Sequence, residues 1–360
     1  MKVKLTEICT PKQWKTIPAN ELLDEGYPVY GANGIIGYYD KYNHENPVVT
    51  ITCRGATCGT VNITEPKSYI TGNAMCLDNV RPDILLEYLY YCLLHYDFSN
   101  VISGSAQPQI TRQGLEKVKI AICSIEEQNK RTSSLRKIST VIVARQQQLQ
   151  KLDELVKARF LEMFGDPNDN PKGYSKKQLK DTCRVITGNT PSRAVSEYYG
   201  EHIEWIKTDN IVSGLLNPTI ATESLSEKGM AVSRTVESGA ILMVCIAGSI
   251  ASIGRVCVTD RKVSFNQQIN AIVPSDYNIL FLYVMLQISK EYLVEEINMA
   301  LKGILSKSKL EEKTFYVPPI ELQEQFAAFV EQTDKSKVAV QKALDEAQLL
   351  FDSLMQKYFE

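Results

Sequence analysis

The segment GSIASIGR at residues 248–255 has the glycine spacing of a loop that could hold phosphate. In phosphate-binding loops, backbone amides surround the phosphate, and Lys followed by Ser or Thr comes directly after the second glycine. Here five residues separate Gly248 from Gly254, and Arg255 and Val256 stand where Lys and Ser or Thr are required. The segment therefore predicts a tight β-turn region and not a nucleotide site.

Other residue types that carry out catalysis are also poorly placed. Glu311 and Lys313 have the spacing of half a nuclease motif, but Glu and Lys often lie this close by chance at a charged helix start. The three histidines lie in unrelated sequence contexts and predict neither a catalytic triad nor a metal cluster; they are His44, His95 and His202. We therefore expect no metal site.

Motifs for methyl transfer to DNA are missing as well. No G-x-G suited to S-adenosylmethionine follows a predicted strand. An Asn/Asp-Pro-Pro-aromatic loop would hold a flipped adenine, but Pro318 and Pro319 are flanked by Val317 and Ile320. The sequence thus predicts a non-catalytic chain that binds no cofactor of its own.

Composition narrows the class of protein. The 360 residues suffice for two domains, and 44% hydrophobic with 23% charged residues is typical of a globular protein. Nine cysteines without a C-x-x-C pair favour buried free thiols over a zinc site. The net charge of −2 does not indicate a nucleic-acid partner, so any binding to nucleic acid would have to depend on local surfaces. With no long apolar run and no apolar signal segment in MKVKLTEICTPKQW, we expect a cytoplasmic protein without a membrane partner.

The elements that position these residues are arranged twice. KVKIAICSIEEQNK at 117–130 alternates like a half-buried strand and then starts a helix, with Ser124 and Glu127 predicting a capping box. KTFYVPPIELQEQFAAF at 313–329 shows the same passage. Leu115, Ile120, Ile122, Ile125 and Glu126 each have a counterpart 195 residues later, in the order Leu310, Phe315, Val317, Ile320 and Glu321. The interval is far too long for a solenoid and predicts a duplicated module.

Each module is predicted to contain a mixed body and one long helix. Short apolar runs at 47–53, 239–248 and 270–275, bounded by turn residues, predict strands, whereas 84–96 and 279–288 predict core helices. Three-four spacing over about five heptads predicts that the long helices form an antiparallel coiled coil. Its seam is expected to contain Leu135, Ile138, Ile142, Leu149, Leu152, Val156, Val330, Val340, Leu344, Phe351 and Leu354.

The predicted fold class is therefore α+β, with two duplicated domains separated by two long helices. The expected boundaries are 1–122 for the first domain, 123–165 for its helix, 166–173 for a linker, 174–318 for the second domain and 319–360 for the second helix.

Taken in this order, the segments resemble the specificity subunit of type I restriction-modification systems. The resemblance is carried by SGSAQPQITRQGLEKVKIAICSIEEQ, RFLEMFGDPNDNPKGY, ITGNTPSR, VPPIELQEQ and YPVYGANGIIGYYD. It implies two target-recognition domains that read a bipartite site on double-stranded DNA. It also implies methyltransferase subunits that use S-adenosylmethionine and motor-nuclease subunits driven by ATP with Mg²⁺, all bound by partners and not by this chain.

With this resemblance, polar loops near glycines become candidate DNA contacts, because backbone there can approach phosphate and side chains can reach base edges. The candidates are Asn33, Arg54, Thr57, Gln107, Gln109, Thr111 and Arg112 in the first body, and Asn189, Thr190, Ser192, Arg193, Ser249, Ser252, Lys302, Ser306, Lys307 and Lys309 in the second. Arg112 could hold guanine with two hydrogen bonds, whereas the lysine cluster around Lys307 suits phosphate. A solvated turn residue is the alternative for each.

Two other functions remain open from the sequence. The chain could be the recognition part of another multi-chain DNA methyltransferase or nuclease system. It could also be a coiled-coil interaction protein without a DNA function.

Overall fold

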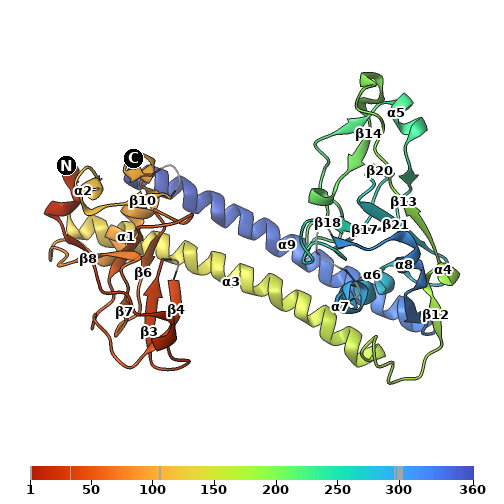
Figure 1. Cartoon of the computed structure of the whole chain (residues 1–360), viewed down its shortest axis with the longest axis horizontal. Helices are drawn as coiled ribbons and strands as arrows, with labels where there is room; N and C mark the ends of the chain where they lie inside the picture. Colours follow the sequence, from red (N-terminus) through yellow and green to blue (C-terminus); the bar gives the residue numbers. More distant parts are fainter. Residues whose placement is uncertain (1, 33, 105–106, 296, 298–302) are drawn as a thin grey trace. The chain divides into compact units, whose positions relative to one another are not determined.

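The computed structural model describes residues 2–32, 34–104, 107–295, 297 and 303–360. It contains two compact units, Met1–Arg145 with Ala343–Glu360 and Gln146–Lys342. Each unit holds one mixed body together with one end of each long helix (Figure 1). The predicted α+β class is confirmed.

The first body is built on a four-stranded antiparallel sheet in the order β2-β8-β5-β6. A second sheet has the order β4-β3-β7, with β3 and β7 parallel. Its strands are β1 (Lys2–Lys4), β2 (Thr10–Gln13), β3 (Tyr27–Gly31), β4 (Gly34–Tyr39), β5 (Val49–Thr52), β6 (Val61–Ile63), β7 (Tyr69–Ile70), β8 (Ala74–Asp78), β9 (Ile102–Ser103), β10 (Gln109–Ile110) and β11 (Lys119–Ala121). Its helices are α1 (Leu86–His95) and α2 (Arg112–Leu115).

The second body repeats this plan. Its antiparallel sheet has the order β13-β21-β17-β19, and a further sheet has the order β15-β14-β20-β16, with β14 and β20 parallel. The strands are β12 (Lys176–Gln178), β13 (Cys183–Thr187), β14 (Tyr199–Ile206), β15 (Ser224–Leu225), β16 (Thr235–Val236), β17 (Ile241–Val244), β18 (Ile246–Ala247), β19 (Val256–Val258), β20 (Val263–Phe265), β21 (Ile269–Pro274), β22 (Gly303–Ile304) and β23 (Thr314–Tyr316). The helices are α4 (Leu179–Thr182), α5 (Glu227–Val232), α6 (Ile279–Ile288), α7 (Lys290–Val294) and α8 (Lys307–Glu312).

Each strand-to-helix passage is anchored by the strand that opens its body. β11 pairs with β1, and β23 pairs with β12, in both cases antiparallel. The long helices follow directly as α3 (Ile125–Phe164) and α9 (Ile320–Phe359). In both bodies, the last strand pairs with the first strand, and the chain then continues directly into a long helix. This arrangement explains the two strand-to-helix passages.

The predicted capping box is half present. The Glu127 backbone N–H donates to the Ser124 hydroxyl at 3.3 Å, as expected of a helix start. The Glu127 carboxylate instead accepts from Arg131 at 2.9 Å, one turn further along α3. The predicted helix start is thus correct. The Glu127 side chain, however, forms an ion pair with Arg131 in place of the second hydrogen bond of a capping box.

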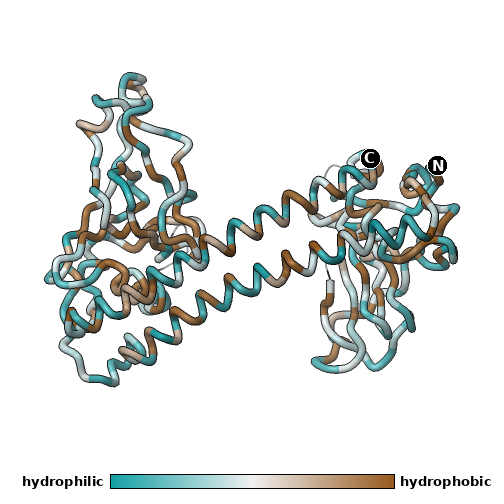
Figure 2. Tube along the Cα trace, turned by 180° about the vertical axis from the view of Figure 1, so that it is seen from behind, coloured by the Kyte–Doolittle hydropathy of each residue, from teal (hydrophilic) through white to brown (hydrophobic). Residues whose placement is uncertain are grey.

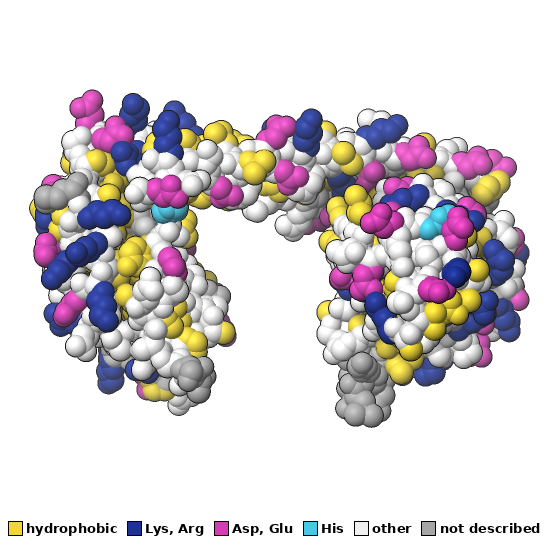
Figure 3. Space-filling view, turned by 90° about the horizontal axis from the view of Figure 1, so that it is seen from above, with side chains coloured by type: hydrophobic (Ala, Val, Ile, Leu, Met, Phe, Trp, Pro, Cys, Tyr) yellow, Lys and Arg dark blue, Asp and Glu magenta, His cyan; other side chains and the backbone are white. Residues whose placement is uncertain are grey.

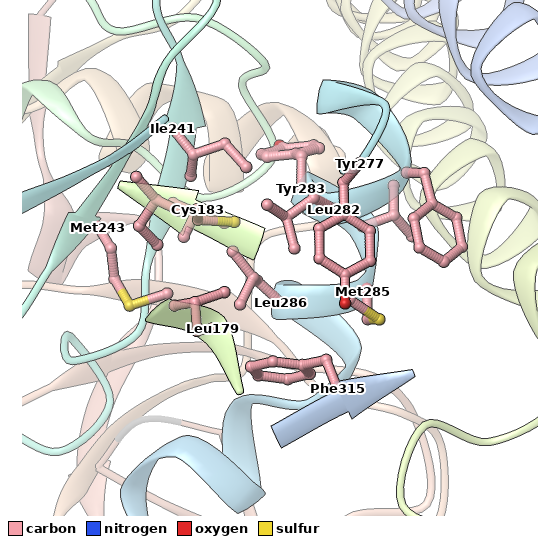
Figure 4. Packing of buried hydrophobic residues seen from close by; sticks show 14 of the residues in the cluster. Leu179, Cys183, Ile241, Met243, Tyr277, Leu282, Tyr283, Met285, Leu286 and Phe315 are labelled. Atoms are coloured by element: carbon pink, nitrogen blue, oxygen red, sulfur yellow. The ribbon is translucent and has the colours of Figure 1, made fainter. Parts of the chain in front are cut away.

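Apolar side chains of α6 form the centre of the second body's core. Leu282 and Leu286 point toward the side where Ile241 and Met243 of β17 lie, whereas Met285 lies beside Tyr277 (Figure 4). Leu179, Cys183 and Phe315 complete this packing from α4, β13 and β23. Because the helix is apolar on nearly all sides, it is buried as predicted, between the sheet and the long helices.

The two long helices pack together, antiparallel, within both units. In the first, Leu135 of α3 shares a buried cluster with Met355 of α9. In the second, Phe160 of α3 packs on Phe326 of α9 with ring centroids 5.4 Å apart. Apolar stretches recur along the length of both helices (Figure 2).

The predicted seam residues differ in burial. Leu135, Val330 and Val340 are buried, whereas Ile138, Ile142, Leu149, Leu152, Val156, Leu344, Phe351 and Leu354 are half-buried. Two of the most deeply buried residues of α3, Phe160 and Phe164, were missed. They contact Phe281 of α6 as well as Phe326, so their burial depends on the body and not on the heptad alone.

Candidate nucleic-acid interface

Two of the proposed DNA-contact segments of the first body lie side by side. Arg54 forms an antiparallel bridge with Gln109, and the Gly55 N–H donates to the Pro108 carbonyl at 3.1 Å. The Ile110 N–H donates to the Cys53 carbonyl at 3.0 Å, which fixes the register. Arg54, Thr57, Gln107 and Gln109 are all exposed. The structure therefore groups them on one surface, which we call the first loop surface (residues 54–57 and 107–112).

An equivalent arrangement exists in the second body. β18 pairs with β22, joining Ile246 to Ile304, and the Leu305 N–H donates to the Cys245 carbonyl at 2.8 Å. Residues 249–252 and 303–309 form what we call the second loop surface. Ile304 takes the place of Gln109, 195 residues later. An apolar, exposed side chain thus replaces an amide at this position.

Short helices continue both surfaces. Thr111 caps α2 by accepting from the Gly114 N–H at 3.1 Å, and Ser306 caps α8 by accepting from the Lys309 N–H at 3.3 Å. These hydroxyls are therefore committed to helix capping. Arg112 and Lys307 are each the first residue of their helix, and both are exposed. The two cations, which are 195 residues apart, therefore occupy matching helix positions.

The two cations differ in their surroundings. Lys307 lies 3.5 Å from the Glu311 carboxylate, one turn along α8. Arg112 forms no ion pair with any residue that the structure describes. Lys309, also on α8, is exposed. Arg112 therefore keeps a guanidinium fork available for a bidentate acceptor.

Ser249 and Ser252 lie in the turn that was first compared with a phosphate loop. Their hydroxyls are 3.1 Å apart, and the Ser252 N–H donates to the Ser249 carbonyl at 3.1 Å. A strand, β19, follows this turn, whereas a phosphate loop requires a helix there. Arg255 donates to the Thr208 carbonyl at 3.1 Å, so it holds a neighbouring loop in place. The turn prediction is confirmed.

Asn189 and Thr190 have internal partners. The Asn189 amide donates to the Val232 carbonyl at 2.9 Å and accepts from the Arg234 N–H at 2.7 Å. Thr190 donates to the Gln267 side chain. Asn189 thus holds the end of α5, and Thr190 is bound to Gln267.

Arg193 is held between aromatic rings and a carboxylate. Its guanidinium lies 4.4 Å from the Tyr199 ring centroid and 5.2 Å from that of Trp205. Glu223 accepts from Arg193 at 2.6 Å and also pairs with Lys207. The hydrogen bond from Lys207, and then that from Arg193, lowers the pKa of Glu223. One carboxylate therefore pairs with two cations, a grouping that the sequence analysis missed.

The remaining candidates divide into two groups. Ser192 is exposed, and its carbonyl accepts from the Val195 N–H at 3.2 Å. Asn33 and Lys302 lie outside the described residues.

Surface charge is not uniform. Several Lys and Arg side chains follow one flank of the first body, whereas basic and acidic side chains alternate over the visible face of the second (Figure 3). Gln267 and Gln268 were also missed as candidates, although the Gln268 carbonyl joins the start of β18 by accepting from the Ile246 N–H at 3.2 Å. Their signal in the sequence was the polar run NQQIN directly after a strand.

Among the helices of the described part of the chain, none combines the length and apolarity needed to cross a membrane.

A family model matches both halves of the chain. The model for the type I restriction modification DNA specificity domain matches residues 1–154 and 171–347. The two matches correspond to the two bodies with the adjoining parts of the long helices.

Individual relatives match smaller parts of the chain than the family model does. The specificity subunit of the type I restriction enzyme HindI from Haemophilus influenzae is 32% identical over 120 residues, which are 32% of this chain and 25% of that protein. That of EcoprrI from Escherichia coli is 29% identical over 142 residues, 38% of this chain and 35% of that protein. The chain thus matches about a quarter and about a third of these two relatives. The specificity subunit of MjaIX from Methanocaldococcus jannaschii is 25% identical over 309 residues, 77% of this chain and 69% of that protein.

Solved structures share the fold. A type I restriction-modification S subunit from M. genitalium has a TM-score of 0.69 at 15% identity, with 100% of this chain and 96% of that chain covered. A chain from a study of type I system assembly has a TM-score of 0.52 at 17% identity, with 99% and 96% covered. Because the family model accounts for both halves, the chain belongs to the type I restriction-modification DNA specificity domain family.

Proposed function

We propose that this chain is the DNA-recognition subunit of a type I restriction-modification complex. Each body would read one half of a bipartite target on double-stranded DNA, and the long helices would set the distance between the halves. The observation that carries the proposal is the family match on both bodies, each of which has a loop surface built from the same backbone pairings.

The partners would supply the chemistry. Methyltransferase subunits would bind S-adenosylmethionine and methylate adenine, and motor-nuclease subunits would use ATP and Mg²⁺. This chain would contribute no catalytic group, and it would act in the cytoplasm. Residues 1–122 and 174–318 would be the recognition domains, 123–165 and 319–360 the spacer helices, and 166–173 the linker.

Within each loop surface, exposed polar side chains would contact DNA. In the first, Arg54, Gln107, Gln109 and Arg112 offer guanidinium and amide groups that suit guanine and adenine edges. In the second, Ser249, Lys307 and Lys309 would mainly hold phosphate.

An exchange of domains tests the proposal. Residues 174–312 are replaced by the equivalent body of a relative, and the chimera is co-produced with a methyltransferase subunit that accepts the original chain. Sequencing of methylated adenines should then show one altered half-site and one unchanged half-site. A change in both halves, or methylation that does not depend on this chain, would contradict the proposal.

A further inference from the structure

Three side chains with metal-binding atoms meet beside the first body's main sheet. They are His44, Cys76 and Asp78, and their nearest ligand atoms all lie within 4.8 Å of one another. The His44 Nε2 is 3.1 Å from Asp78 Oδ1. Cys76 is fully buried, and only 12% of the His44 side chain and 14% of the Asp78 side chain are exposed. The expectation that the histidines lie in unrelated contexts overlooked this grouping, because His44 is 32 residues from Cys76 in the chain.

The orientation of His44 is set by Asn43. The Asn43 Nδ2 donates to the Ile70 carbonyl at 3.0 Å, and its Oδ1 accepts from the Ile70 N–H at 2.9 Å. These two bonds fix which amide atom is oxygen. The His44 Nδ1 lies 2.7 Å from that oxygen and must therefore be the donor. In the neutral ring the Nε2 lone pair then points toward Asp78, as in histidines that bind metals.

Asp78 is oriented in a similar way. The Trp14 indole N–H donates to Asp78 Oδ2 at 3.2 Å, leaving Oδ1 directed at His44. The Trp14 ring also packs edge-on against the His44 ring, with centroids 5.1 Å apart. Both potential ligands therefore have an outer partner that holds them in position, an arrangement common around bound metal ions.

Cys76 completes the group because of its place in β8. Residues 76 and 78 are two apart in a strand, so their side chains lie on the same face of the sheet.

We propose that His44, Cys76 and Asp78 form a binding site for a divalent transition-metal ion of the Zn²⁺ type. One nitrogen, one sulfur and one oxygen ligand suit this class better than Mg²⁺ or Ca²⁺, which prefer oxygen alone. Bonds of about 2.0–2.1 Å at tetrahedral angles would separate the nitrogen and oxygen atoms by about 3.4 Å, close to the 3.1 Å found here. The ion would tie the segment around residue 44 to β8, and this role does not depend on DNA reading.

The alternative is an ion pair without a metal. If His44 carries a second proton, its Nε2 donates directly to Asp78, and Cys76 has no part in the arrangement. The two possibilities differ in one measurable respect, which is whether the Cys76 sulfur binds the cation.

Cobalt substitution distinguishes them. The full chain is stripped with a chelator, kept reduced and titrated with Co²⁺, which takes the same ligands and reports on them by absorption. We expect one tightly bound ion per chain, with a thiolate-to-cobalt charge-transfer band in the near ultraviolet. Zn²⁺ should remove the band and raise the melting temperature of the first body.

Variants assign the band to this site. Cys76→Ser and His44→Gln should abolish it, whereas Cys257→Ser, at an equally buried cysteine in the second body, should leave it unchanged. The proposal is overturned if the unaltered chain shows no thiolate band, a result that needs no variant to fold. It is also overturned if the band survives Cys76→Ser.

Discussion

The side chain of Gln128, near the start of α3, makes two bonds that correspond to those of Gln323, near the start of α9. Gln128 Oε1 accepts from the Leu85 N–H and Gln323 Oε1 from the Asn278 N–H, both at 2.9 Å. Leu85 and Asn278 are the residues that precede α1 and α6. Gln128 Nε2 donates to the Cys123 carbonyl at 3.0 Å, and Gln323 Nε2 to that of Pro318 at 2.8 Å. In each unit, one buried amide therefore joins a long helix to its body's core helix.

Loss of either amide should destabilise its own unit. Gln128→Ala or Gln323→Ala leaves buried or partly buried backbone groups unpaired, and each such group costs about 1–3 kcal/mol when buried. We expect a decrease of about that size in the free energy of unfolding, measured by urea denaturation. Gln150→Ala, which removes an exposed 2.8 Å bond to Glu154, should cost less than about 0.5 kcal/mol. Equal effects of the buried and exposed changes would refute this role.

Arg112 and Lys307 should contribute differently to DNA binding. In the complex with methyltransferase subunits, Arg112→Ala should relax specificity at one position of the first half-site, by about 1–3 kcal/mol. Lys307→Ala should weaken binding to all sequences alike and lower the salt slope by about one. Binding to matched and mismatched duplexes at several salt concentrations measures both. If Arg112→Ala weakens both duplexes equally, Arg112 contacts phosphate and does not read a base.

Lengthening both long helices should lengthen the gap between half-sites. Leu135 clusters with Met355, and Lys337 pairs with Asp153, so the same 18 residues separate these contacts on each helix. An insertion in α3 alone would make the two helix segments between these contacts unequal in length, so the contacts could not both form. Seven residues added to each helix between these contacts extend it by about 10 Å. Methylome sequencing should then show a gap longer by at most about three base pairs, with both half-sites unchanged. Altered half-sites at the original gap would argue against the spacer role.

Glu204 should make the second body sensitive to acid. Arg261 donates to both Glu204 oxygens, at 2.6 and 2.9 Å, and the Ala221 N–H donates at 2.8 Å. The Arg261 hydrogen bonds lower the pKa of Glu204. Because the folded pKa is depressed, its stabilisation is complete above the unfolded value of about 4.3 and is lost as the pH falls through the folded value.

Glu204→Gln should therefore cost about 1–3 kcal/mol at neutral pH and flatten the acid limb of the stability curve. Urea denaturation between neutral and acidic pH measures both effects. Glu237→Gln provides a control, because its pair with Lys262 at 2.8 Å is exposed and contributes about 0–1 kcal/mol. An acid limb that is unchanged in Glu204→Gln would contradict this assignment.

The sequence was sufficient for the architecture because the determining patterns are local. Strand alternation, the Ser124 helix start and three-four spacing each depend on neighbours within a few residues. The interval of 195 residues repeats them, so two bodies and two long helices could be predicted without coordinates. Gln128 in SIEEQ and Gln323 in IELQEQ stand out in the sequence as well, but the groups that they bind could not be predicted.

The tertiary structure decided which of the candidate polar side chains remain available to contact DNA. Thr111 and Ser306 cap helices, Asn189 holds α5, and Arg193 pairs with Glu223, which is 30 residues away in the chain. The same holds for His44, which meets Cys76 and Asp78 only because a loop folds back onto β8. Such partnerships depend on through-space distances between segments that are remote in sequence. Periodicity determines which face of an element is buried, but only the packed chain determines what each polar group on the surface contacts.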